Sequence, residues 1–310
     1  MRLVLAVAAL LATAAPALPQ ERGGPFTVQE SGRSYGSLQE AVSAIGGGRG
    51  TIRIAPGRYG DCAVQEAGEI SFVSEVPGKA IFDRAICEGK ATLVLRGRGA
   101  KVDGIVFMRT LVEDGNGAGI RLETGDLHVT NAMFIDGQCG ILTASFPQGK
   151  ITIERSTFAG LGKDPTGNGA HALYIGDYGS LRILQSRFER GTGGHYVKVR
   201  APRIEILDSS FDDSQGRNTN YSIDISNGAT GRIAGNSFEQ GPNKDNYSTM
   251  IAVAPEGAKH SSGGLLIENN KAWLSPAFKE RTTFVGNWSR DAVVVRGNEL
   301  AARIAPVAQR

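Results

Sequence analysis

The stretch Ile151-Thr-Ile-Glu-Arg-Ser-Thr-Phe158 carries the pattern that decides the fold of this chain. It reads apolar, any, apolar, any two residues, a small or amide residue, any residue, and a bulky apolar residue. Apolar residues at every second position are typical of a strand, so each copy predicts a short strand and a bend. The copies, some of which match only the later part of the pattern, span Val102–Phe107, Leu127–Phe134, Ile151–Phe158, Leu181–Phe188, Ile204–Phe211, Ile233–Phe238, Leu265–Ala272 and Val293–Leu300.

The final positions of these copies lie 27, 24, 30, 23, 27, 34 and 28 residues apart, and repeats of this length indicate a solenoid. Helical repeats would need long i, i+3, i+4 patterns, which are absent after Ile45, and hexapeptide or nonapeptide β-helices have shorter periods. We therefore expect an all-β parallel β-helix with two or three strands per coil. Loops of unequal length should gather on one side, where binding surfaces usually form.

One column of the repeat is small and polar where the chain would bend between strands. Stacked side chains at such a bend can bond to one another and to the turn backbone, so we expect this column to be structural. Its members are Ser156, Ser186, Ser209, Asn236, Asn270 and Asn298.

The segment before the repeats predicts a helical cap. Ser37-Leu-Gln-Glu40 is a capping box, and apolar residues at helical spacing follow it up to Gly46. A strand pattern, Thr51-Ile-Arg-Ile54, comes directly afterwards. A helix in this place would cover the open end of an elongated sheet structure, whose unpaired backbone needs protection.

Taken together, these motifs resemble the right-handed parallel β-helix of the pectin-lyase-like superfamily. The resemblance rests on the helix followed by Thr-Ile-x-Ile-x-Pro-Gly-x-Tyr59 and on the Ile-x-x-Asn-x-Phe coils, and it covers about Ser37 to Leu300. The segments 195–201 and 221–228 also resemble exported bacterial β-helix proteins. The superfamily includes polysaccharide lyases, polygalacturonases, pectin methylesterases and non-catalytic surface proteins, so the resemblance implies the fold without fixing the activity.

The N-terminus predicts export. Arg2, a short apolar run and Ala15-Pro-Ala17 form the charged region, apolar region and cleavage site of a signal peptide at residues 1–17. We assign residues 18–50 to a lead-in and capping helix, 51–300 to the β-helix and 301–310 to a C-terminal tail. We expect a secreted or periplasmic monomer without membrane insertion, and the formal net charge of +3 argues against nucleic acid as a partner.

Three cysteines are an odd number for an exported chain. Cys62 and Cys87 are 25 residues apart, close to one repeat, so they are placed to form a disulfide between adjacent coils. Cys139 would then be a buried free thiol.

The candidate site is a polar ladder on three successive strands. Aligning Leu173, Val197 and Ile223 in one buried column places Tyr174, Lys198 and Asp224 side by side on the opposite, exposed face. Arg200 lies two residues from Lys198 and therefore on the same face. A lyase acting on a uronate needs a base, a cation for the carboxylate and a proton donor. We assign these roles to Lys198, to Arg200, and to Tyr174 or a histidine, with Asp224 orienting the lysine.

Further residues converge on the same coils. His171 and His195 stand at the start of two of the strands and are candidate acids or ligand-binding groups. Tyr221, Asn220 and Asn227 are candidate substrate-binding residues. Each of these also has a structural interpretation: opposite charges on neighbouring strands stabilise a sheet, and histidines with inward parity are often hydrogen-bonded at a bend.

Calcium is the only cofactor that the sequence brings into consideration, through Glu113-Asp114 or Asp212-Asp213, although neither loop has a recognisable ligand spacing. The second acidic pair also fits an ordinary Asp- and Ser-rich turn. The leading hypothesis is an exported β-helix protein that acts on or binds an acidic polysaccharide, with a lyase as the catalytic form. The alternative is a non-catalytic carbohydrate-binding or envelope-structural protein.

Overall fold

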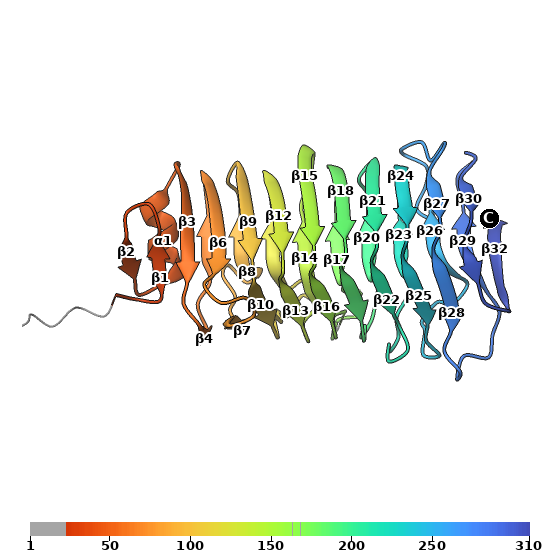
Figure 1. Ribbon diagram of the computed structural model, residues 1–310, viewed down its shortest axis with the longest axis horizontal. Coiled ribbons are helices and arrows are strands. Elements are labelled where there is room, and N and C mark those ends of the chain that lie inside the picture. Colours follow the sequence, from red (N-terminus) through yellow and green to blue (C-terminus); the bar gives the residue numbers. More distant parts are fainter. Residues whose placement is uncertain (1–22, 163, 168) are drawn as a thin grey trace, which may run out of the picture.

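The computed structural model describes residues 23–162, 164–167 and 169–310, and the predicted signal peptide lies outside this range. The chain winds into a long parallel β-helix whose strands form three sheets along its axis (Figure 1). We call these sheets A, B and C in the order in which each coil visits them. The predicted all-β parallel β-helix is thus confirmed.

Sheet A has twelve strands among the described residues. In spatial order they are β2 (Arg33–Tyr35), β1 (Phe26–Val28), β3 (Arg49–Ile54), β6 (Glu69–Ser74), β9 (Gly99–Asp103), β12 (Asp126–Thr130), β15 (Phe146–Glu154), β18 (Tyr178–Leu184), β21 (Arg203–Leu207), β24 (Thr230–Ala234), β27 (Leu266–Glu268) and β30 (Val294–Arg296).

Sheets B and C have ten strands each within the same range. The strands of sheet B are β4 (Gly57–Tyr59), β7 (Ala80–Asp83), β10 (Ile105–Met108), β13 (Met133–Ile135), β16 (Thr157–Ala159), β19 (Arg187–Glu189), β22 (Ser210–Asp212), β25 (Ser237–Gln240), β28 (Lys271–Leu274) and β31 (Glu299–Leu300). The strands of sheet C are β5 (Ala63–Gln65), β8 (Ala91–Leu95), β11 (Ala118–Leu122), β14 (Cys139–Thr143), β17 (Leu173–Ile175), β20 (Val197–Val199), β23 (Ile223–Ile225), β26 (Thr249–Val253), β29 (Thr282–Asn287) and β32 (Ile304–Gln309).

The repeat pattern builds the interior directly. The copies from Val102–Phe107 to Ile233–Phe238 end in a phenylalanine on sheet B, and rings such as Phe134 and Phe158 stack coil upon coil with centroids 4.7 Å apart. The stack of buried phenylalanines continues to Phe238 and gives way to Ala272 in the next coil. Burying a side chain of this size stabilises the fold by about 1.5–3 kcal/mol, so the column is a main part of the core.

The serine and asparagine column forms the expected ladder at the bend between sheets A and B. The side-chain oxygen of each member accepts a hydrogen bond from the backbone N–H of the residue one coil earlier, as from Ser186 N–H to Ser209 Oγ at 3.1 Å and from Ser209 N–H to Asn236 Oδ1 at 2.9 Å. Its structural role is therefore confirmed.

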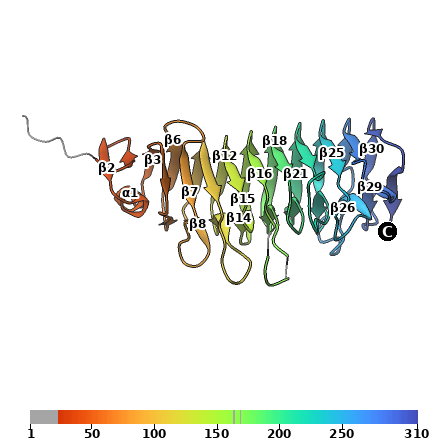
Figure 2. The same cartoon turned by 90° about the horizontal axis from the view of Figure 1, so that it is seen from below.

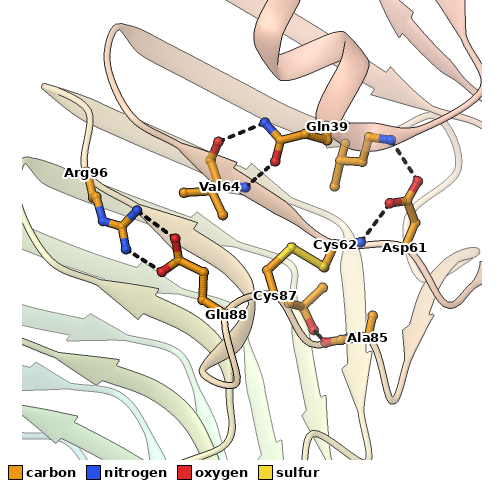
Figure 3. The surroundings of a disulfide bond; sticks show 10 residues. Gln39, Asp61, Cys62, Val64, Ala85, Cys87, Glu88 and Arg96 are labelled. Carbon is orange, nitrogen blue, oxygen red and sulfur yellow. Dashed lines mark hydrogen bonds and ion pairs between the residues drawn. A yellow bond between two sulfur atoms is a disulfide. The ribbon is translucent and has the colours of Figure 1, made fainter.

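The capping helix α1 (Leu38–Ile45) begins at the predicted capping box, in which Ser37 and Glu40 exchange hydrogen bonds. Its Gln39 side chain donates to Val64 O at 3.1 Å and accepts from Val64 N–H at 2.8 Å (Figure 3). The side-chain amide of Gln39 thus forms the two hydrogen bonds that a neighbouring strand would otherwise make with Val64 of the edge strand β5.

The disulfide lies close beneath this cap. Cys62 and Cys87 are bonded, with Cα atoms 5.6 Å apart, and join the first coil to the next (Figure 3). Cys139 is a buried free thiol, and burial raises its pKa to about 11. Both sequence expectations about the cysteines are confirmed.

The two ends of the β-helix differ from the expected boundaries. The lead-in contains β1 and β2, which pair antiparallel and extend sheet A beyond β3, and the expected tail at 301–310 contains β32, which pairs with β29. At both ends an unpaired strand edge recruits further backbone. The strands β1 and β2 have only three residues each, and β32 has no alternation of buried and exposed residues, so neither end shows a strand periodicity in the sequence.

Candidate functional site

The predicted polar ladder forms on sheet C. Tyr174, Lys198 and Asp224 are direct neighbours across β17, β20 and β23, as the alignment of the apolar columns predicted. The ladder is not exposed as expected, because Lys198 is 7% and Asp224 2% accessible. The connection from β26 to β27, residues 254–265, folds over these two side chains and covers the outer face of sheet C, which the sequence predicted to be exposed.

Lys198 lies at the centre of an ionic cluster. Its Nζ atom donates to Asp224 Oδ2 at 2.8 Å and to Glu256 Oε1 at 2.5 Å. Both contacts are charge-assisted hydrogen bonds to carboxylates, so the donors of the Lys198 side chain are already directed at anionic groups. The geometry therefore suits Lys198 for holding an anion better than for acting as a base.

Arg200 connects the two ends of the cluster. Its Nη2 atom donates to Glu256 Oε2 at 2.5 Å, its Nη1 atom donates to Tyr174 Oη, and its guanidinium carbon lies 5.0 Å from the centroid of the Tyr174 ring. Tyr174 thus holds the guanidinium from the coil below, while Glu256 holds it from the covering loop.

Asp224 is the most deeply placed member of the cluster. Burial raises the pKa of its carboxyl group, with Lys198 acting in the opposite direction. Its Oδ1 atom is buried and accepts no hydrogen bond of normal geometry within the part of the chain that the structure describes. For Glu256, burial also acts to raise the pKa, but the contacts with Lys198 and Arg200 outweigh it and the pKa is lowered.

The two histidines stack at the start of the strands, as predicted. Their ring centroids are 4.9 Å apart, and the ring of Tyr221 continues the stack 5.3 Å from His195. His171 Nδ1 accepts the backbone N–H of His195, and His195 Nδ1 accepts that of Tyr221. These bonds place the proton of a neutral ring on Nε2, and His195 Nε2 lies 3.3 Å from Asp224 Oδ2.

Burial controls the charge of both rings. It lowers the pKa of His171 to about 3, assisted by the positive charges of Lys198 and Arg200. It lowers the pKa of His195 as well, with His171 and Lys198 adding to the effect. Both pKa shifts favour the neutral imidazole, which carries its N–H on Nε2, and the N–H of His195 faces Asp224.

Two adjoining cavities run along this face of sheet C and share Gly169 and His171. One, of about 650 Å³, is lined by His171, His195, Lys198, Asn220 and Glu256 among others. The second, of about 520 Å³, is lined by residues that include Lys90, Arg121 and Tyr174. We call the two together the sheet C groove. The loops that precede β8, β11 and β17 project on one side of the β-helix and supply part of its wall (Figure 2).

The three predicted substrate-binding residues have different positions. Asn220 lines the groove, where its side-chain amide donates to Asp245 Oδ2 at 3.0 Å. Tyr221 lies behind His195, and its hydroxyl accepts from Asn246 Nδ2 at 3.0 Å. Asn227 lies under the covering loop, where its carbonyl accepts the His260 N–H at 2.8 Å. Of the three, only Asn220 is among the groove-lining residues that the structure describes.

Sequence reasoning missed Glu256, the residue that completes the cluster. It belongs to a long loop without periodicity, so no strand pattern assigns it a neighbour. The available signal was the 34-residue interval between Phe238 and Ala272, the longest of the series. It marks an insertion in this coil, although it does not say where the insertion folds.

One of the two acidic pairs considered for calcium has a different environment from the one expected. Asp213 is buried and paired with Lys244, whose Nζ lies 3.2 Å from Asp213 Oδ2, rather than part of an exposed turn. Across residues 23–162, 164–167 and 169–310, no group of three or more His, Cys, Asp or Glu side chains is placed to hold a metal ion. In the same ranges, no helix is long and apolar enough to cross a membrane.

Fold and site together define a parallel β-helix protein with a polar groove, partly covered by a loop, on one sheet. No protein-family model matches the chain, and no curated protein matches it. Among solved structures, it is similar to the Streptococcus pneumoniae surface protein and adhesin PfbA, with 12% identity, a TM-score of 0.46, and coverage of 88% of this chain and 94% of that chain. Since a fold does not determine a function, the residues of the groove have to indicate it.

Proposed function

We propose that this protein is an exported carbohydrate-binding protein that holds an acidic, uronate-containing polysaccharide in the sheet C groove. The proposal includes export through the signal peptide at residues 1–17 and an outlying place in the pectin-lyase-like superfamily, which its cap and coils resemble. The observation that carries it is the pair of cations, Lys198 and Arg200, which together hold one carboxylate at the groove.

The rest of the groove has the chemistry that a sugar chain requires. Sugars present hydroxyl groups that need donors and acceptors, and the larger cavity offers side-chain amides (Asn218 and Asn220) and neutral imidazoles (His171 and His195). Each cavity falls within the usual size range for a small-molecule site, about 300–1,000 Å³, so the groove has room for more than one ring.

A polysaccharide lyase is the second candidate. It is favoured by the presence of Lys198, Arg200 and Tyr174 in one hydrogen-bonded cluster beside the groove, because a lysine, an arginine and a tyrosine are the groups that β-elimination needs. It is disfavoured by the 2.8 Å contact between Lys198 Nζ and Asp224 Oδ2, because this contact engages the atom that would have to take the substrate proton and does not depend on Glu256. Binding is therefore the function that the geometry supports best.

Calorimetric titration with oligogalacturonate and with its methyl ester tests the proposal. The ester has the same ring without the charge, so we expect the wild-type protein to bind the acid at least about tenfold more tightly. Lys198→Met should lose that preference, whereas Lys101→Met, an exposed lysine on β9 of sheet A, should keep it. Equal binding of acid and ester by the wild-type protein would contradict an acidic ligand.

The same mixtures separate binding from lysis. β-Elimination creates an unsaturated uronate that absorbs ultraviolet light, so a binding protein gives a flat trace with and without calcium. An absorbance rise that disappears in Lys198→Met would instead establish the lyase and assign the base.

A further inference from the structure

The loop that covers the ladder is an insertion confined to one coil. We call residues 254–265 the strap. The connections from sheet C to sheet A in the three preceding coils span only residues 176–177, 200–202 and 226–229. A longer connection was not needed to link the two sheets, so the additional residues of the strap have a different role.

The strap lies across the three coils before its own. Its backbone is fixed to the nearest coil, where Glu256 N–H donates to Ser226 O at 3.0 Å and His260 N–H donates to Asn227 O at 2.8 Å. Its side chains reach further, since Glu256 contacts β20 and Lys259 Nζ lies 2.7 Å from Asp177 Oδ2. The two ends of the strap are buried at Ala254, Ser262 and Leu265, whereas residues 255–261 between them are exposed or half-buried. The part that contains Glu256 and Lys259 is therefore held mainly by polar contacts that water or a ligand can replace.

Glu256 binds the two cations in the way that a ligand carboxylate would. Each of its oxygens accepts from a different cation, Lys198 on one side and Arg200 on the other, both at 2.5 Å. The Glu256 side chain is 41% exposed, whereas that of Lys198 is 9% exposed. The cations therefore lie inside, and the carboxylate that neutralises them lies at the opening.

The cluster tolerates the departure of Glu256. Lys198 keeps Asp224 at 2.8 Å, and the Arg200 guanidinium keeps the hydroxyl and ring of Tyr174. Neither cation would become an isolated buried charge, which is the situation that makes breaking an ion pair costly. The backbone on both sides of Glu256 has positive φ, 58° at Ala254 and 112° at Gly257, so this part of the strap is held in a conformation that an alanine rarely adopts.

Resting on the proposed function, we infer that Lys198 and Arg200 form a carboxylate-binding site which Glu256 occupies in the ligand-free protein. A uronate carboxylate displaces Glu256 and the strap opens. The strap then competes with the ligand from within the same chain. The apparent affinity for the uronate equals the affinity of the open protein multiplied by the fraction of molecules in which the strap is open. A neutral sugar has nothing to exchange for Glu256, so the strap also raises selectivity for acidic chains.

The test compares Glu256→Gln with the wild-type protein, using trigalacturonate as the probe in calorimetric titration. Glutamine keeps the shape of the side chain and removes the competing charge, so we expect the variant to bind about tenfold more tightly if the strap is closed in about nine molecules of ten. Lys259→Ala removes the outer anchor and should give a smaller gain. Glu280→Gln, an exposed glutamate outside the groove, should change nothing.

Hydrogen exchange of the strap amides provides the second measurement. Saturating trigalacturonate should accelerate exchange at Glu256 and His260 in the wild-type protein, because their backbone bonds to the turn after β23 break on opening. Binding by the wild-type protein with unchanged affinity in Glu256→Gln and unchanged exchange would overturn this inference and leave the proposed function standing. An absence of binding to both proteins would overturn the two together.

Discussion

Two lysine–aspartate pairs lie close together in this molecule and differ in almost every respect. The side chains of Lys244 and Asp213 are each about 1% exposed. The Asp213 carboxylate also accepts from Tyr196 Oη, Thr219 Oγ1 and Gly241 N–H. Lys198 lines a cavity and also contacts Glu256, whose side chain is partly exposed. Its partner Asp224 has an Oδ1 atom that accepts no hydrogen bond within the described chain. We call them the interior pair and the groove pair.

The difference separates a structural ion pair from one that is available to a ligand. A buried charge is tolerated only when its hydrogen-bonding capacity is satisfied, and the interior pair meets that condition with groups from its own chain. The groove pair meets this condition only in part, and one of the groups that contribute to it is Glu256, which lies at the opening of the groove. The two pairs therefore differ in how fully their hydrogen-bonding groups are satisfied, more than in charge or residue type.

The largest expected effect comes from removing one carboxylate from each pair. Asp213→Ala leaves Lys244 buried without a counter-charge, so we expect the free energy of unfolding to fall by about 3–5 kcal/mol. Asp224→Ala leaves Lys198 with Glu256, so we expect a loss of about 1–2 kcal/mol. Urea denaturation of both variants measures the difference. Equal losses would mean that the groove pair is as structural as the interior pair.

The next largest effect is expected from lowering the pH, because the buried histidines that titrate lie beside the groove pair. The pKa of His171 in the folded protein, about 3, lies below its ordinary value, so the unfolded state binds more protons between pH 6.5 and 3. Stability should therefore fall as the pH falls through this window, by about 2–3 kcal/mol between pH 7 and pH 4. His171→Asn keeps an acceptor for the His195 amide and does not titrate, so its stability should depend less steeply on pH. An unchanged slope would assign the effect to other groups.

The smallest effect comes from the same substitution made once in each region. Tyr196→Phe removes a buried hydroxyl that donates to Asp213, and we expect a loss of about 1–2 kcal/mol. Tyr174→Phe removes a hydroxyl that accepts from Arg200 beside the groove, and we expect a loss of about 0.5 kcal/mol. Thermal unfolding of the two proteins, measured side by side, gives the comparison. A greater loss in Tyr174→Phe would reverse the assignment of the two regions.

Much of the fold is visible in the sequence because each coil repeats the same physical requirements. The positions of Phe158 and Ser186 could be predicted because equivalent residues recur one coil away. The ladder of Tyr174, Lys198 and Asp224 could be predicted by aligning the apolar residues beside them. The roles of the ladder residues remain predictions that the experiments above address.

By itself, the sequence determined the parallel β-helix, its cap and the register of β17, β20 and β23, and it placed Cys62 and Cys87 where a disulfide can form. All of these depend on local periodicity or on separations of one coil, and both can be read along the chain. Only the tertiary structure decided that Asp213 is paired with Lys244 inside and that Glu256 covers Lys198 and Arg200. Those contacts arise from loops, whose residues follow no period, and a loop takes its position from the partners it finds after the coils have formed.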